Sequence, residues 1–115
     1  FNPGSTLVIH GYAHTMARTA VTTTLSAAMG GLTGLLVKRC MPKKLGGSGL
    51  YDIGHTCNSL LGALVGITAG CATVHPWAAI LIGIIAAFVY HAASYMTQKR
   101  TLALTRTLTP KPPRT

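Results

Sequence analysis

Acidic side chains are nearly absent from this sequence. Asp52 is the one acidic residue among 115, against ten Lys and Arg, and the formal net charge is +9. Charged residues make up 10% of the chain, whereas a soluble domain has roughly 25%. This scarcity of charge, together with 49% hydrophobic residues and a mean hydropathy of +0.43, excludes an ordinary soluble domain.

Cysteine ligand patterns and leader signals are absent as well. The cysteines Cys40, Cys57 and Cys71 form no CxxC or other metal-ligand spacing, and the last two fall inside apolar spans. We therefore expect no disulfide framework, no metal and no cofactor. The opening segment, residues 1–5, has neither a Met nor a basic leader, so we expect a piece of a longer protein.

Long uncharged spans dominate what is present. Ile53 to Val74 and Trp77 to Met96 contain no Lys, Arg, Asp or Glu, and a weaker uncharged span runs from Thr19 to Val37. A helix rises about 1.5 Å per residue, so ~20 apolar residues cross the roughly 30 Å hydrocarbon core of a bilayer. We predict an all-α integral membrane protein with three transmembrane helices, at about residues 15–37, 52–74 and 76–97.

Small residues recur at helical spacing in these spans. Such a stripe is typical of membrane helices that pack together, because close backbone approach and Ser/Thr hydrogen bonds replace the missing hydrophobic drive. In the first span the stripe consists of Thr19, Thr23, Ser26, Gly30, Thr33 and Val37. The bulky face opposite holds Val21, Leu25, Leu32, Leu35 and Leu36. The predicted helix-packing glycines are Gly30, Gly34, Gly62, Gly66 and Gly70.

Basic residues gather in two connecting regions. Four lie between the first and second spans, and five follow the third. The positive-inside rule then places both clusters in the cytoplasm, with residues 1–14 and the His75-Pro76 turn outside. A basic excess can also indicate nucleic-acid binding, but this placement favours a membrane topology, and we expect no nucleic-acid partner. The clusters are Lys38, Arg39, Lys43 and Lys44, and Lys99, Arg100, Arg106, Lys111 and Arg114.

The last segment, residues 98–115, has little apolar content. It is composed mainly of Thr, Pro and basic residues, which cannot bury a core. We predict that residues 98–115 form a basic, Thr/Pro-rich disordered tail after a membrane domain at residues 1–97.

Two stretches resemble the ammonium transporter family, the Amt/Mep/Rh superfamily. One is Phe1-Asn2-Pro3-Gly4-Ser5, and the other runs from Asp52-Ile53-Gly54-His55 through Ala69-Gly70-Cys71 to Pro76-Trp77-Ala78-Ala79. Between them, residues 18–25 resemble the next family helix. The resemblance covers residues 1–97, with the motifs in the family's order, and assigns them to the end of helix six through helix nine.

The resemblance implies an eleven-helix fold, a narrow hydrophobic pore in each subunit and a homotrimer. It implies transport of ammonium or ammonia across a membrane, in a multi-pass protein of the plasma membrane, and no enzyme activity or catalytic residue. By position, Phe1 corresponds to the pore gate and Ser5 to the hydroxyl that recruits ammonium. Aromatic faces and hydroxyl acceptors suit this role, because they replace the water around a cation.

The five histidines match no family site. The family's two pore histidines lie on helices five and ten, which this sequence does not contain, and we assign no role to His10, His14, His55, His75 or His91. Two other functions remain open. The first is a truncated helix-packing module that associates with intact transporter subunits without conducting. The second is a cationic peptide that binds the surface of anionic membranes.

Overall fold

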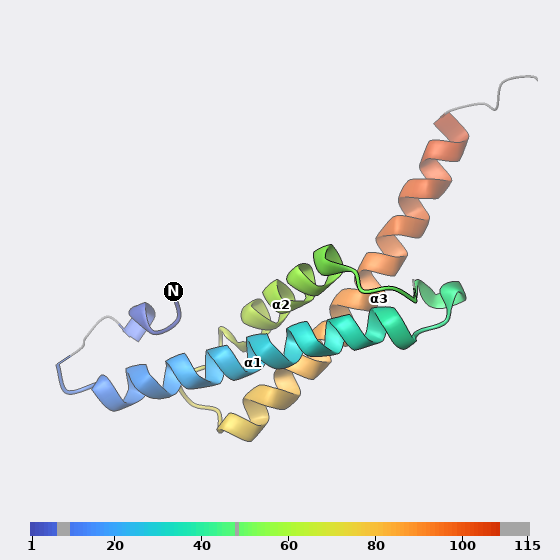
Figure 1. The fold of residues 1–115 in the computed structure, drawn as a ribbon. Helices are drawn as coiled ribbons and strands as arrows, with labels where there is room; N and C mark the ends of the chain where they lie inside the picture. Colours follow the sequence, from blue (N-terminus) through green and yellow to red (C-terminus); the bar gives the residue numbers. More distant parts are fainter. Residues whose placement is uncertain (7–9, 48, 109–115) are drawn as a thin grey trace, which may run out of the picture.

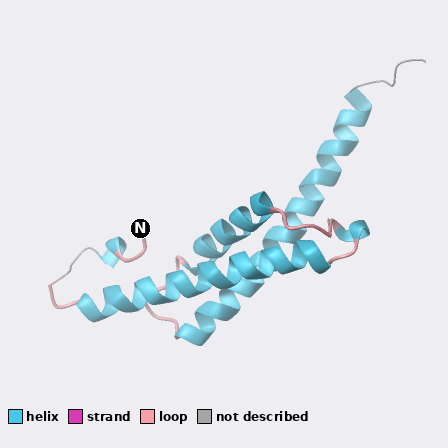
Figure 2. Cartoon of the chain, viewed as in Figure 1, coloured by secondary structure: helices cyan, strands magenta, loops and turns pink. Residues whose placement is uncertain are grey.

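Three long helices form the body of the computed structural model, which describes residues 1–6, 10–47 and 49–108. They are α1 (Ala13–Cys40), α2 (Ile53–Ile67) and α3 (Pro76–Leu108). Short 3-10 turns, η1 (Gly4–Thr6) and η2 (Lys43–Leu45), precede α1 and follow it. α2 runs back along α1, and α3 returns in the direction of α1 (Figure 1). The described residues contain no strand, which confirms the all-α prediction (Figure 2).

α1 and α2 meet along small residues. A Cβ atom on Gly30 would overlap the Cβ of Ala63, and one on Gly34 would overlap the side chain of Ser59. At this closeness, side chains reach the backbone of the facing helix: the Ser26 hydroxyl donates to the Ala63 carbonyl oxygen at 3.2 Å, and the Ser59 hydroxyl donates to the Gly30 carbonyl oxygen at 2.9 Å. Glycine and serine thus hold this pair of helices together.

The third helix closes on α1 in the same way. A Cβ atom on Gly83 of α3 would overlap the Ser26 carbonyl oxygen. Ala79, Gly83, Ala87 and His91, each four residues from the next, form the buried face of α3. The one buried apolar cluster among the described residues consists of Ile67, Cys71 and Ala79, with Val74 and Ile82 packed against it.

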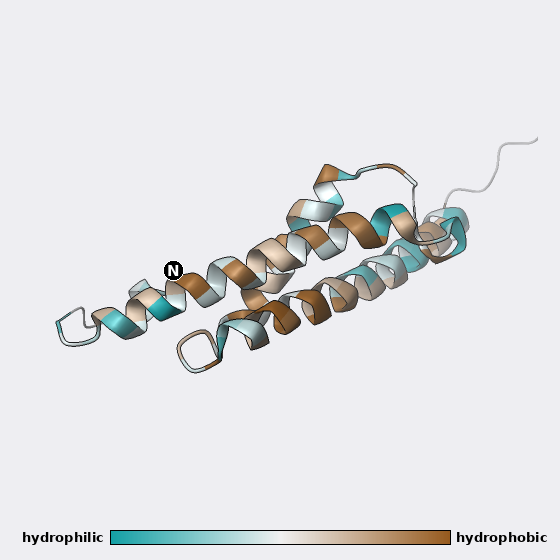
Figure 3. Cartoon of the chain, turned by 60° about the horizontal axis from the view of Figure 1, so that its bottom comes forward, coloured by the Kyte–Doolittle hydropathy of each residue, from teal (hydrophilic) through white to brown (hydrophobic). Residues whose placement is uncertain are grey.

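Bulky apolar side chains point outward. The fully buried polar residues are Thr19, Thr22, Ser26 and Ser59, whereas Val21, Leu32, Leu36, Val65, Leu81, Ile85, Phe88 and Val89 are about half exposed or more. The middle of α1 and of α3 is hydrophobic and the ends are hydrophilic (Figure 3). Exposing bulky apolar side chains to water is unfavourable, whereas exposing them to hydrocarbon is not. The pattern is therefore typical of a bundle surrounded by lipid.

Two of the helices are long enough to cross a bilayer, namely α1 and α3. α2 has 15 residues and is therefore about 22 Å long, which is shorter than the roughly 30 Å hydrocarbon core. The helix predicted at residues 52–74 thus ends at Ile67, and residues 68–74 continue as turns. The carbonyl oxygens of Cys71, Thr73 and Val74 are bound by side chains of α1, which removes their need for helical partners.

The prediction of a disordered segment from residue 98 differs from the structure, because α3 continues to Leu108. Gln, Lys, Arg, Leu and Ala at residues 98–104 are good helix formers, and the first proline of this region is Pro110. The hydroxyls of Thr101 and Thr105 also donate to the carbonyl oxygens four residues earlier, at 3.0 and 2.9 Å. Residues 109–115 of the predicted tail lie outside the described residues.

The α1–α2 contact leads to a first prediction. Gly30→Ala forces the two helices apart and lowers the free energy of unfolding in detergent by about 1–3 kcal/mol, as overpacking does. Gly62→Ala is the matched control, because its Cβ would lie 3.6 Å from the Cβ of Tyr90, an ordinary contact. Both variants gain helix propensity equally, so an equal melting temperature for the two would contradict the close approach.

Candidate functional site

The end of the bundle at the start of α1 holds the two residues that the family resemblance selects. The side-chain amide of Asn2 donates to the Thr23 hydroxyl at 3.3 Å, which ties the N-terminal segment to α1. The Phe1 side chain is 97% exposed, and the exposed Ser5 hydroxyl donates to the Phe1 carbonyl oxygen at 3.1 Å. The Ser5 hydroxyl therefore lies against the backbone of Phe1, and a hydroxyl that donates its hydrogen in this way keeps its acceptor capacity.

Arg18 binds the segment that follows α2. Its Nη2 donates to the carbonyl oxygens of Thr73 and Val74, at 3.3 and 3.2 Å. One turn further along α1, the Thr22 hydroxyl donates to the Cys71 carbonyl oxygen at 2.6 Å. The turns at 68–74 expose carbonyl oxygens that a continuing helix would have used, and α1 supplies their donors.

The predicted packing glycines fall into three environments. Gly30 and Gly34 lie at the α1–α2 contact described above. Gly62 and Gly66 line an apolar groove of about 550 Å³ between α2 and α3, with Val65, Ile82 and Val89 among its other lining residues. Gly70 lies in the turns after α2, where a Cβ would come within 3.1 Å of the Val74 side chain.

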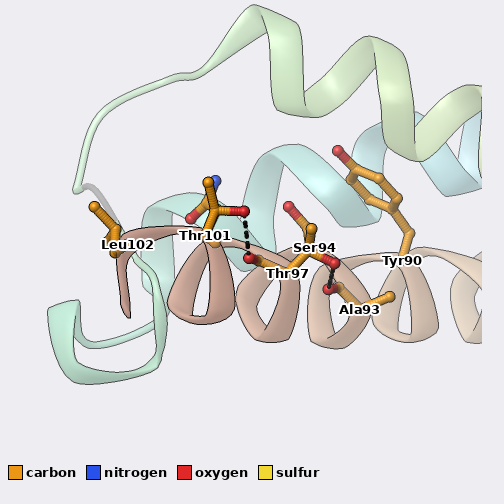
Figure 4. A pocket seen from close by; sticks show the side chains of 7 residues that line it. Tyr90, Ala93, Ser94, Thr97, Thr101 and Leu102 are labelled. Atoms are coloured by element: carbon orange, nitrogen blue, oxygen red, sulfur yellow. Dashed lines mark hydrogen bonds between the residues drawn. The ribbon is translucent and has the colours of Figure 1, made fainter. Parts of the chain in front are cut away.

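A second groove, of about 650 Å³, follows one face of α3 from Tyr90 to Leu102 (Figure 4). Its lining includes the hydroxyl groups of two threonines, and both are already used within the helix. The Thr97 hydroxyl donates to the Ala93 carbonyl oxygen at 2.9 Å, and Thr101 donates to the Thr97 carbonyl oxygen. The groove is lined mostly by apolar atoms.

At the other end of the bundle, the connector between α1 and α2 rests on α3. The Tyr95 hydroxyl donates to the Lys44 carbonyl oxygen at 2.6 Å, and Nε2 of His91 lies 3.1 Å from the Leu45 carbonyl oxygen. Nδ1 of His91 lies 3.3 Å from Nε2 of His55 on α2. Both imidazoles are buried, each with 6% exposure, and their rings meet edge to face.

Sequence reasoning did not anticipate this histidine pair. His55 lies near the start of α2 and His91 is 16 residues into α3, so neither sequence distance nor spacing links them. The pair could have been found from the positions of the two residues along their helices. In two consecutive antiparallel helices, the start of the first lies beside the later part of the second. Among the described residues, no group of three or more His, Cys, Asp or Glu side chains could hold a metal.

The sequence matches the model of the Ammonium Transporter Family over residues 1–104. The chain belongs to the ammonium transporter family. It is 39% identical to ammonium transporter 1 member 2 of Arabidopsis thaliana over 109 residues, covering 86% of this chain and 20% of the relative. It is 42% identical to ammonium transporter 1 member 2 of Oryza sativa subsp. japonica over 99 residues, covering 77% and 19%.

A third relative is ammonium transporter 1 member 1 of Solanum lycopersicum, 40% identical over 109 residues that cover 86% of this chain and 21% of the relative. No solved structure matches the chain. This ammonium transporter chain thus spans about a fifth of the length of the curated relatives it matches. The family is one of transporters, not of enzymes, and the predicted all-α transporter fragment is confirmed.

The contacts of Arg18 lead to a second prediction. Arg18→Gln weakens the turns after α2, and the backbone amides of Gly70, Thr73 and Val74 exchange hydrogen about fivefold faster, because losing a charged donor at a half-exposed site costs roughly 1 kcal/mol. Arg39→Gln is the control. Its guanidinium lies over the Tyr51 ring at the far end of the bundle, 4.4 Å from the centroid, so these amides keep their rates. Equal rates in both variants would show that Arg18 does not hold the segment.

Proposed function

We propose that this chain forms part of a protein that passes ammonium or ammonia across a membrane. The match to the family over residues 1–104 carries the proposal. The structure supports it independently, because the three helices bury small and hydroxylated residues and leave bulky apolar ones to face lipid. The remaining four-fifths of such a transporter supply the other walls of the pore.

The proposal assigns α1, α2 and α3 to family helices seven, eight and nine, and residues 1–6 to the end of helix six. Phe1 is then the gate residue and Ser5 the hydroxyl that accepts a hydrogen bond from ammonium at the outer entrance. The hydrogen bond from the Ser5 hydroxyl to the Phe1 carbonyl oxygen keeps the two residues close to each other and supports this assignment. A recruiting site must lie at the entrance, since a hydrated cation does not enter an apolar pore at low cost.

The proposal extends to assembly and location. We place the groove lined by Gly62 and Gly66 against a neighbouring subunit of a homotrimer, and the protein in the plasma membrane. Support comes from the groove's apolar lining, which favours a helix or lipid over water. The Lys-rich connector at residues 38–44 faces the cytoplasm in this arrangement.

A chimaera tests the transport function. Residues 1–97 replace the matching segment of the Arabidopsis relative, in yeast cells that lack their own ammonium transporters, and uptake of labelled methylammonium is measured. We expect uptake to be retained. Ser5→Ala in the chimaera should raise the substrate concentration needed for half-maximal uptake about tenfold, because one hydrogen bond to a cation is lost.

Thr24→Ala serves as the matched control, since this exposed hydroxyl donates only to the Ala20 carbonyl oxygen within α1, at 2.8 Å. A chimaera that reaches the cell surface without transporting would reject the proposed function. An unchanged half-maximal concentration in Ser5→Ala would reject the role of Ser5 alone.

Membrane insertion leads to a further prediction, which separates this proposal from the cationic surface peptide. A peptide held by charge leaves the membrane in alkaline carbonate, whereas spanning helices remain. We expect the 115-residue chain, expressed in the same cells, to stay in the membrane pellet after this wash. Release into the supernatant would contradict insertion of α1 and α3.

A further inference from the structure

The buried His55–His91 pair joins three segments of the chain. Nε2 of His55 on α2 lies 3.3 Å from Nδ1 of His91 on α3, and Nε2 of His91 lies 3.1 Å from the Leu45 carbonyl oxygen in the connector. The three groups form a single line of contacts at the end of the bundle that carries the basic connector. The proposed transport function uses neither histidine.

The carbonyl oxygen fixes every proton in this line. A carbonyl accepts only, so Nε2 of His91 must carry a hydrogen and donate to Leu45. Nδ1 of a neutral His91 is then an acceptor, and Nε2 of His55 must donate to it. The neutral His55 therefore has an unprotonated Nδ1, and this atom makes no hydrogen bond to any other described residue.

We propose that the two imidazoles form a binding site for one proton, which enters at Nδ1 of His55. Forming this N–H bond breaks none of the existing hydrogen bonds. The added charge is shared across the His55–His91 hydrogen bond, because moving the central proton from Nε2 of His55 to Nδ1 of His91 preserves the same contacts. The connector therefore stays on α3 when the proton binds.

A second proton has no place. Both facing nitrogens would carry hydrogens, and two positive rings would meet with their centroids 5.2 Å apart. The His55–His91 bond would break, and the ring of His91 would lose the partner that orients it toward the connector. The pair is therefore a one-proton site, in contrast to two independent histidines.

The surroundings contain charges of both signs. Lys38 of α1 lines the same enclosed space as the two rings, together with Ser94 and Gln98. At the start of α2, the Asp52 carboxylate accepts from the backbone N–H of His55 at 3.0 Å. From α3, the Tyr90 ring lies 5.0 Å from the His55 ring, and Tyr95 binds the connector at Lys44. One cation and one carboxylate thus face the site.

Nitrogen NMR of the full chain in detergent micelles tests the proposal, with ¹⁵N-labelled histidine rings followed between about pH 8 and 5, where imidazoles titrate. We expect Nδ1 of His55 to become an N–H group while Nε2 of His91 remains one throughout, with one proton bound per pair. The connector amides of Gly46 and Gly47 should keep their hydrogen-exchange protection during this uptake, because they bind Lys43 and Pro42 carbonyls in the docked connector.

Two variants complete the test. His55→Gln keeps an N–H donor for His91 but has no ring nitrogen at residue 55, so uptake at that residue should vanish and any proton bound should appear at Nδ1 of His91. Tyr95→Phe removes the other connector bond and should loosen the connector while uptake remains one proton. The proposal is overturned if the wild-type rings bind two protons, if neither binds one, or if Nε2 of His91 is unprotonated at high pH. Loss of connector protection upon uptake by the wild type would also overturn it.

Discussion

Hydrogen bonds from serine hydroxyls to the backbone of a facing helix are the contacts on which this bundle depends. Ser26 and Ser59 reach across the α1–α2 contact in opposite directions. Both hydrogen bonds require the helices to lie so close together that a Cβ atom at Gly30 or Gly34 would overlap the facing helix. In lipid, apolar surface gives little drive for association, so close backbone packing and these bonds supply it. α3 packs on α1 through its own close contact, in which Gly83 lies against the Ser26 carbonyl oxygen.

The same constraint explains why the bundle buries so little apolar volume. Its centre contains threonine, serine, glycine and alanine, and its bulky residues face outward. A family of membrane transporters provides the setting in which this arrangement is stable, because neighbouring helices and lipid tails cover the outer faces. Substitutions that enlarge the centre therefore damage the fold more than substitutions on the exposed leucines.

The sequence predicted the three helices and much of the packing face, since Thr19, Ser26, Gly30 and Val37 are all buried. Periodicity identifies such a face because it depends on a single helix. The end of α2 at Ile67 was not predictable in this way, as it depends on donors that Arg18 and Thr22 bring from another helix. The prediction missed the helical continuation of α3 beyond residue 97 because it weighed the Thr, Pro and basic residues of the whole segment and not the helix formers at 98–104. It missed the histidine pair because their contact depends on how α2 and α3 lie side by side. The roles of Phe1 and Ser5 remain predictions.

Arg18 also has a consequence for the carbonyl oxygens of the turns after α2. Broken helices in membrane proteins often present unsatisfied carbonyl oxygens, and these are the ligands that alkali and ammonium ions take in place of water. Here a guanidinium fixed to α1 already occupies the oxygens of Thr73 and Val74. A covalently attached cation cannot diffuse away, so these two carbonyl oxygens are already bound and are not free to coordinate a cation from solution.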